Sequence, residues 1–321
     1  RVLIDVSLHV DSDKIDPRLL DALKEEDALI VVDEADYGAW TDTSRSILQQ
    51  YTQCGENLVL LSTGSNIERA MIGAKGDIQP LIHYSYVDML ELKRQGDPTY
   101  ENLVEITCLN LDANDVFFED QNSLSAADRI NNRKIFSKRN THIQRNFVLQ
   151  NICDEDRGND LFGVYLRHYR NIDHLAGIVW IPGTKEDVDN IAKVTKSIAP
   201  HYNVIALHSD DHTTAQKYVK KSIEEAKEKG LERTIIYTCG MGARSFSIPN
   251  VVFSLDCFDG GGLAPAQQRA SRCLTPGGDK IGDAGYGKQG GLIVNWTFHP
   301  ERCSTFELDL ITSGMKKNGN D

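Results

Sequence analysis

The chain has 321 residues, 40% of them hydrophobic, and a formal net charge of −12 at pH 7. This length is typical of two domains, and this composition excludes a mainly disordered chain. The seven cysteines form no C-x-x-C pair, and no apolar run approaches the roughly 18 residues of a membrane span, so neither a zinc site nor a transmembrane helix is predicted. We therefore expect reduced thiols, a cytoplasmic location and no membrane partner.

Aliphatic strands separated by helical segments mark the first part of the chain. The pattern predicts strands at residues 2–6, 29–32, 58–61 and 103–109, and helices at residues 17–24 and 44–51. Strands that are apolar on both faces and alternate with helices favour a parallel sheet.

The same alternation returns later in the chain. Strands are predicted at residues 177–181, 204–207, 234–237, 251–255 and 292–296, and helices at residues 185–198 and 213–229. The second helix ends at Gly230, a common helix stop. Residues 119–160 are polar and poor in strand signals, so we expect a helical linker or insertion there. The sequence thus predicts an α/β fold of two blocks, residues 1–118 and 161–321, with mainly parallel sheets.

Three acids follow the predicted strand at residues 29–32, namely Asp33, Glu34 and Asp36. In open α/β sheets the ligand lies beyond the carboxyl ends of the strands, where these side chains would emerge. One acid there can hold Mg²⁺ through water, and its neighbour can orient an attacking water for phosphoryl transfer. An acidic turn without a chemical role is the alternative.

Three further motifs follow these acids in order. The next strand closes on Ser62-Thr63-Gly64, a later one ends at Thr238 before Arg244, and a helical segment carries Gln268, Arg269 and Arg272. Together with Asp33-Glu34-Ala35-Asp36, this series resembles motifs II, III, V and VI of the superfamily 2 helicases and translocases.

The resemblance implies two RecA-like domains in tandem that bind ATP and Mg²⁺ between them. Residues 177–182 would be motif IV. The phosphate-cradling G-x-x-x-x-G-K-[ST] loop of such motors is not in the sequence. We expect the chain to be a fragment that is truncated within the first domain and is inactive alone. A degenerate relative that does not hydrolyse ATP is the other possibility.

The resemblance also implies roles for the matched residues of the first domain. Asp33 would hold Mg²⁺ through its water shell, Glu34 would polarise the attacking water, and Asp36 would bridge towards motif VI. Ser62 and Thr63 would couple the state of the nucleotide to closure of the two domains.

On the second domain, Arg272 stands at the position of an arginine finger, which stabilises the charge of the transferring phosphoryl group. Arg269 is the second candidate, and Gln268 would lie beside it at the nucleotide. Thr238 would contact the nucleic-acid backbone, and Arg244 would face the cleft.

A basic segment at residues 128–145 is the second indication of nucleic acid. Six basic residues stand there against Asp128 alone, a net charge of +5, and they include Arg133, Lys134, Lys138 and Arg139. The segment is either a solvated helix or linker, or an element that contacts phosphates. The negative net charge of the whole chain does not decide between them, because net charge governs solubility and steering more than the position of a groove.

We therefore expect an ATP-dependent helicase or translocase. Motif VI lacks the His-Arg-x-Gly-Arg pattern of RNA helicases, so DNA is favoured over RNA. A nucleic-acid-binding module built on a degenerate ATPase fold is the alternative.

Overall fold

The computed structural model describes residues 29–32, 58–62, 86–113, 135–153, 159–207, 215–239, 247–258, 263–278, 285–301 and 307. The chain divides into two compact units, Arg1–His83 and Tyr84–Asp321. Each unit has a sheet of its own.

In the first unit, β1 (Leu29–Val32) and β2 (Leu58–Leu61) form a two-stranded parallel sheet. The register runs from Leu29 opposite Leu58 to Val32 opposite Leu61. Both predicted strands and their parallel pairing are confirmed. The strand predicted at residues 2–6 and the helices predicted at residues 17–24 and 44–51 lie outside the described residues.

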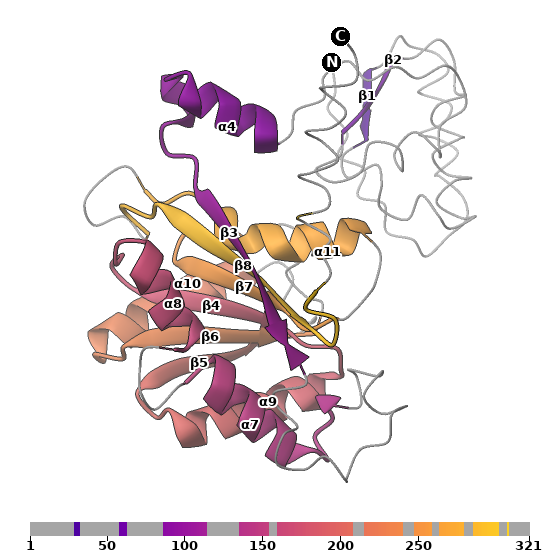
Figure 1. The fold of residues 1–321 in the computed structure, drawn as a ribbon, viewed down its shortest axis with the longest axis vertical. Coiled ribbons are helices and arrows are strands. Elements are labelled where there is room, and N and C mark those ends of the chain that lie inside the picture. The colour runs from indigo at the N-terminus through magenta and orange to yellow at the C-terminus, as the bar shows by residue number, and fades with distance from the viewer. Residues whose placement is uncertain are drawn as a thin grey trace. The chain divides into compact units, whose positions relative to one another are not determined.

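Six strands build the sheet of the second unit, in the order β3-β8-β7-β4-β6-β5 (Figure 1). They are β3 (Glu105–Asp112), β4 (Leu175–Trp180), β5 (Tyr202–Leu207), β6 (Arg233–Thr238), β7 (Val251–Asp256) and β8 (Gly290–Thr297). Every neighbouring pair is parallel. This sheet confirms the predicted α/β class, and β4 to β8 confirm the strands predicted in the second block.

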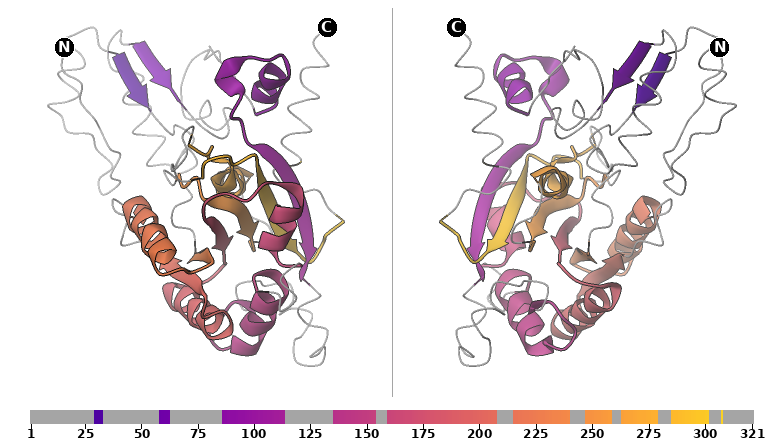
Figure 2. Two further views of the ribbon diagram at one scale, coloured as in Figure 1. Left: turned by 90° about the vertical axis from the view of Figure 1, so that its left-hand side faces the viewer. Right: turned by 90° about the vertical axis from the view of Figure 1, so that its right-hand side faces the viewer.

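Helices cover both faces of this sheet (Figures 1 and 2). One face packs on α7 (Thr141–Asn151), α8 (Leu161–His168) and α9 (Lys185–Ile198), and the other on α10 (Ala215–Glu228), α11 (Leu263–Ala270) and the 3₁₀ helix η4 (Ser271–Leu274). The two faces follow the alternation of strand side chains, since Val179 belongs to the first core and Ile178 to the second. Before β3 lie α4 (Tyr86–Arg94) and the 3₁₀ helix η1 (Pro98–Tyr100).

The helix predicted at residues 185–198 is confirmed as α9. Its start is set by a capping box, in which the Thr184 hydroxyl accepts a hydrogen bond from the Asp187 main-chain N–H and the Asp187 carboxylate accepts one from the Thr184 N–H. The helix predicted at residues 213–229 is α10, and Gly230 after it has a φ of +68°, which favours glycine.

The structure places β3 differently from the sequence-based expectation. We expected this strand in the first domain, but Glu105 pairs with Gly290 and the register continues along β8 to Asp112 opposite Thr297. The boundary between the units lies after His83, whereas we expected one at residue 118. The pattern of β3 mixes polar and apolar residues, and a strand sequence does not reveal which sheet will pair with it.

The segment expected to be a linker also contributes to the second unit. In its described part, α7 packs on α9, and Phe147 and Val148 are fully buried in the core. The helical character expected for residues 119–160 is confirmed at α7, but α7 is a layer of the unit rather than a connection to it.

Candidate functional site

The candidate site lies at the carboxyl edge of the six-stranded sheet. Trp180, the last residue of β4, pairs in register with Thr238 on β6 and with Asp256 on β7. After β4, the chain forms β5 and β6 on one side of that strand and β7 and β8 on the other. The row of strand ends therefore lies at a topological switch point, where open α/β sheets place their ligands.

An ion pair fixes α11 to this edge. Arg269 donates from Nε and Nη2 to Oδ2 of Asp256, at 2.9 and 2.8 Å, and both side chains are largely buried. The guanidinium carbon lies 4.5 Å from the centre of the Phe258 ring. Removing one partner of such a pair would leave the other as an uncompensated buried charge.

The electrostatics of Asp256 reflect this burial. Burial raises the pKa of the Asp256 carboxyl, against the opposing effects of the Arg269 guanidinium and of a hydrogen bond from the Phe258 N–H at 2.9 Å. With two donor groups on it, the carboxylate is a fixed anchor for α11 and not a free general base.

A second link joins the main chain of α11 to the strands. The indole Nε1 of Trp180 donates to Oγ of Ser254 at 2.8 Å, and that hydroxyl donates to the main-chain oxygen of Arg269 at 2.8 Å. The main chain of Arg269 is thus held by Ser254, and its side chain is held by Asp256. We had not singled out Ser254 or Asp256 from the sequence; the signal for Asp256 was an aliphatic strand ending in an acid.

Arg272 lies one turn further along, where α11 tightens into η4. Its Nε donates to the main-chain oxygen of Gln268 at 2.9 Å, and Ser271 Oγ donates to the same oxygen at 3.0 Å. Arg272 is half-buried, whereas Gln268 and Arg269 are buried. Of the two arginines, Arg272 has the more exposed side chain.

Thr238 ends β6 and has a fully buried side chain. Its main-chain oxygen accepts a hydrogen bond from the Ile181 N–H at 2.9 Å, just after β4. The structure thus brings the predicted motif IV and motif V strands together as neighbours.

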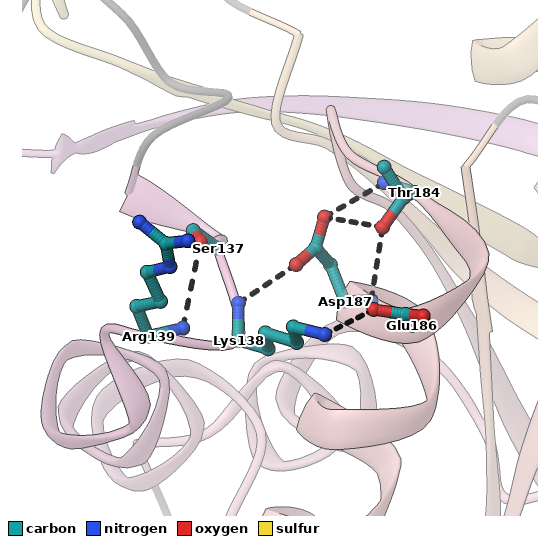
Figure 3. A network of polar contacts seen from close by, with 6 residues as sticks. All are labelled: Ser137, Lys138, Arg139, Thr184, Glu186 and Asp187. Carbon is teal, nitrogen blue, oxygen red and sulfur yellow. Dashed lines mark hydrogen bonds and ion pairs between the residues drawn. The ribbon is translucent and has the colours of Figure 1, made fainter.

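The described part of the basic segment docks at the start of α9 (Figure 3). One carboxylate connects the two: Asp187 Oδ1 accepts from the Lys138 N–H at 2.7 Å, while Oδ2 accepts from the N–H and the hydroxyl of Thr184, each at 2.8 Å. Burial acts to raise the pKa of Asp187, but these hydrogen bonds outweigh it and hold that pKa below its usual value. The Lys138 ammonium forms an exposed ion pair with Glu186, and Arg139 is exposed.

Of the other predicted site residues, only some lie within the described residues. Ser62 directly follows β2 and is exposed. Asp33, Glu34, Asp36, Thr63, Arg133, Lys134 and Arg244 lie outside the described residues. Among the described residues no group of three His, Cys, Asp or Glu side chains could hold a metal ion, and none of the described helices has the length and apolar character to cross a membrane. On the turn that follows α11, Arg272 is a half-buried cation.

No family model matches the chain, and no curated protein matches it. Solved structures do. A fragment described as an HsdR subunit of a type I restriction enzyme from Vibrio vulnificus has 12% identity and a TM-score of 0.49, over 87% of this chain and 45% of that one. The ATP-dependent type ISP restriction-modification enzyme LlaBIII, bound to DNA, has 11% identity and a TM-score of 0.48, over 84% of this chain and 18% of that one.

A third similar structure is S. cerevisiae Dbp5 bound to RNA and ADP BeF3, with 12% identity and a TM-score of 0.39 over 94% of this chain and 62% of that one. The chain spans less than two thirds of each of these three proteins. Because all three TM-scores lie below 0.5, the function proposed below rests on the residues and the geometry of the chain itself.

Proposed function

We propose that the chain is part of an ATP-dependent nucleic-acid helicase or translocase of superfamily 2. The single observation that carries the proposal is the clamped α11, in which Arg269 is tied to the carboxyl end of β7 and the following turn carries the half-buried Arg272. An arginine held there by the main chain is suited to stabilise charge on a phosphoryl group.

The two arginines would have different roles. Arg269 is committed to Asp256 and to the Phe258 ring, so we assign it to positioning α11. Arg272 is then the arginine finger. From the resemblance, Asp33 would hold Mg²⁺ and Glu34 would orient the water that attacks ATP, both after β1.

Nucleic acid would be held by the basic segment, with Lys138 and Arg139 exposed at the start of α9. Of the two kinds of nucleic acid we favour DNA, because motif VI lacks the pattern of RNA helicases. The missing G-x-x-x-x-G-K-[ST] loop favours a second candidate, a nucleic-acid-binding module that does not hydrolyse ATP.

Steady-state ATP hydrolysis with and without single-stranded DNA tests the proposal. The chain as printed should not turn over ATP, because it supplies no loop to cradle the β- and γ-phosphates. A longer protein that contains this chain together with such a loop should turn over ATP, and Glu34→Gln should lower its kcat by on the order of 10²–10⁴-fold with little change in ATP affinity, since the amide keeps the volume but loses the charge that orients water.

The matched control is Glu228→Gln, the same change at an exposed position on α10, which should leave kcat unchanged. Robust turnover by this chain alone would show that the loop is not needed for hydrolysis. A full-length protein that binds single-stranded DNA but never hydrolyses ATP would favour the binding module instead.

A further inference from the structure

The glycine-rich segment that follows η4 folds back on itself. Gly285 has a φ of +76°, and a Cβ at Gly277 would collide with the Gly285 main-chain oxygen, so these two glycines permit a close approach of two stretches of backbone. The Lys288 N–H donates to the Gly285 oxygen at 3.0 Å and closes the turn. The side chain of Lys288, at the end of this turn, is buried.

The ammonium group of Lys288 joins two segments that are distant in sequence. Its Nζ donates to the Val251 main-chain oxygen at 2.6 Å, at the start of β7, and to the Thr275 main-chain oxygen at 2.9 Å, just after η4. Lys288 is only 6% exposed. Every hydrogen bond that Lys288 makes in the described part of the chain goes to a main-chain carbonyl, so no carboxylate neutralises it there.

The surroundings disfavour the charged form of this amine. Burial lowers the pKa of Lys288 to about 7. Within the described residues, the titratable group that interacts with it is the Cys273 thiol on η4, while β7 and the loop after η4 contact it with main-chain carbonyls. Burial also raises the pKa of the Cys273 thiol to about 12, so this thiol is neutral near pH 7 and gives Lys288 no counter-ion.

Arg272 lies midway between two anchors. Three residues before it, Arg269 is clamped to Asp256 on β7; three residues after it, the Thr275 oxygen is held by Lys288. Both anchors attach the arginine-bearing turn to the same strand, one near each end of β7. Between the two anchors, Cys273 is fully buried in the core.

We infer that Lys288 is a positioning residue, whose buried amine clasps the chain after η4 to β7 and thereby fixes where Arg272 points. The role of Arg272 in this inference rests on the proposed function. The clasp itself does not, because it is a property of the second unit alone.

The clasp responds to pH in a defined direction. In an opened or unfolded chain the lysine regains its ordinary pKa of 10.5. Between about pH 7 and 10.5 the opened state therefore binds more protons than the closed state, so the closed state gains stability as the pH rises through this window. As the pH falls, that stability is lost, and little further loss follows below about pH 7.

The first measurement uses the wild-type chain. Lysine labelled with ¹³C reports the Cε shift of Lys288 against pH, with its signal identified by its absence in the Lys288→Met variant, or in Lys288→Arg should the first variant not fold. We expect a midpoint near 7. An ordinary lysine midpoint near 10.5 would overturn the buried clasp.

The second measurement compares hydrogen–deuterium exchange at residues 271–278 in wild type, Lys288→Met and Lys221→Met, each at pH 7 and pH 9. Lys221 is the matched control, because its side chain is 78% exposed on α10. Exchange at residues 271–278 should be several-fold faster in Lys288→Met than in wild type. After correction for the intrinsic exchange rates, protection should rise from pH 7 to pH 9 in wild type and Lys221→Met but not in Lys288→Met. Equal exchange in all three proteins would overturn the clasp.

The third measurement is ATP hydrolysis by the full-length protein. If Arg272 is positioned through Thr275, Lys288→Met should lower kcat by roughly 10- to 100-fold with little change in KM. Faster exchange with an unchanged kcat would overturn the positioning of Arg272. If the full-length wild type hydrolyses no ATP while residues 271–278 still loosen in Lys288→Met, the proposed function fails and the clasp stands.

Discussion

At the scale of single residues, the segment that resembles motif VI carries two arginines in different environments. Arg269 is desolvated, paired with a carboxylate and stacked on an aromatic ring, whereas Arg272 is half-buried and bonded through Nε to the main chain of its own helix. Burial makes the first costly to remove from the folded state. The second keeps the exposure that a group acting on a ligand requires.

Alanine substitutions should separate the two roles. Arg269→Ala leaves Asp256 buried and unpaired, so it should lower the free energy of unfolding of the chain by about 3–5 kcal/mol. Arg272→Ala should change stability little but lower kcat of the full-length protein by roughly 10³-fold or more. Urea denaturation and steady-state kinetics measure the two effects.

The control is Arg170→Ala, at an exposed position after α8, which should alter neither quantity. The double variant Asp256→Asn with Arg269→Gln should lose less stability than Arg269→Ala, because no charge is then left buried. An Arg272→Ala enzyme with normal kcat would show that motif VI has been assigned wrongly.

Some of these residues were predictable and others were not. Arg269 and Arg272 stand out in a sequence motif, but the burial that separates them depends on Asp256 and Phe258, which lie on another strand. Lys288 follows Gly285-Tyr286-Gly287, which looks like part of a phosphate loop in sequence. Its inward direction follows from a backbone conformation that the sequence permits but does not specify.

At the scale of elements, the start of α9 shows how local signals and long-range contacts differ. The bounds of α9 were predicted because Thr184 and Asp187 cap it from within a few residues. The same Asp187 also accepts from the Lys138 N–H, a contact between residues that are far apart in sequence (Figure 3). No local sequence pattern predicts such a contact, so the packing of the basic segment against the start of α9 could not be predicted.

The basic segment should contribute phosphate contacts. Changing Arg133, Lys134, Lys138 and Arg139 together to glutamine should weaken binding of single-stranded DNA across sequences. Each lost contact should reduce the slope of log K against log salt by roughly one unit, since fewer counterions are released. Fluorescence anisotropy at several salt concentrations measures both effects.

A matched control exists on α10 and just after it. Lys217, Lys220, Lys221 and Lys229 are exposed lysines, and their joint change to glutamine removes the same number of charges. If both quadruple variants lose the same slope, general charge and not the basic segment explains the binding. If the first keeps the parental slope, residues 128–145 are a solvated face.

At the scale of the whole chain, two units stand where we expected two domains, but their boundary lies after His83. The alternation of strands and helices was enough to predict the α/β class and most strands of the second sheet. It was not enough to place β3, because the membership of a strand depends on which edge accepts its hydrogen bonds.

Truncation tests this boundary. A chain of residues 84–321 contains the whole six-stranded sheet and both of its cores, so it should unfold in one cooperative transition. A chain of residues 119–321 lacks β3 and leaves the edge of β8 unpaired, so it should have a lower Tm and a greater tendency to aggregate. Thermal unfolding of both chains can be followed by circular dichroism. Equal Tm values for the two chains would contradict the place of β3 in this unit.

The pairing of β3 with β8 also determines when the sheet can be completed during translation. Of the six strands, β3 leaves the ribosome first, yet its partner β8 is made last. The nascent unit therefore carries an unmatched strand while every intervening element is translated, and the closing contact joins residues as distant as Glu105 and Gly290. Contacts of such high sequence separation slow folding and prolong exposure of unpaired edges, so newly made chains should depend on chaperones until translation passes β8.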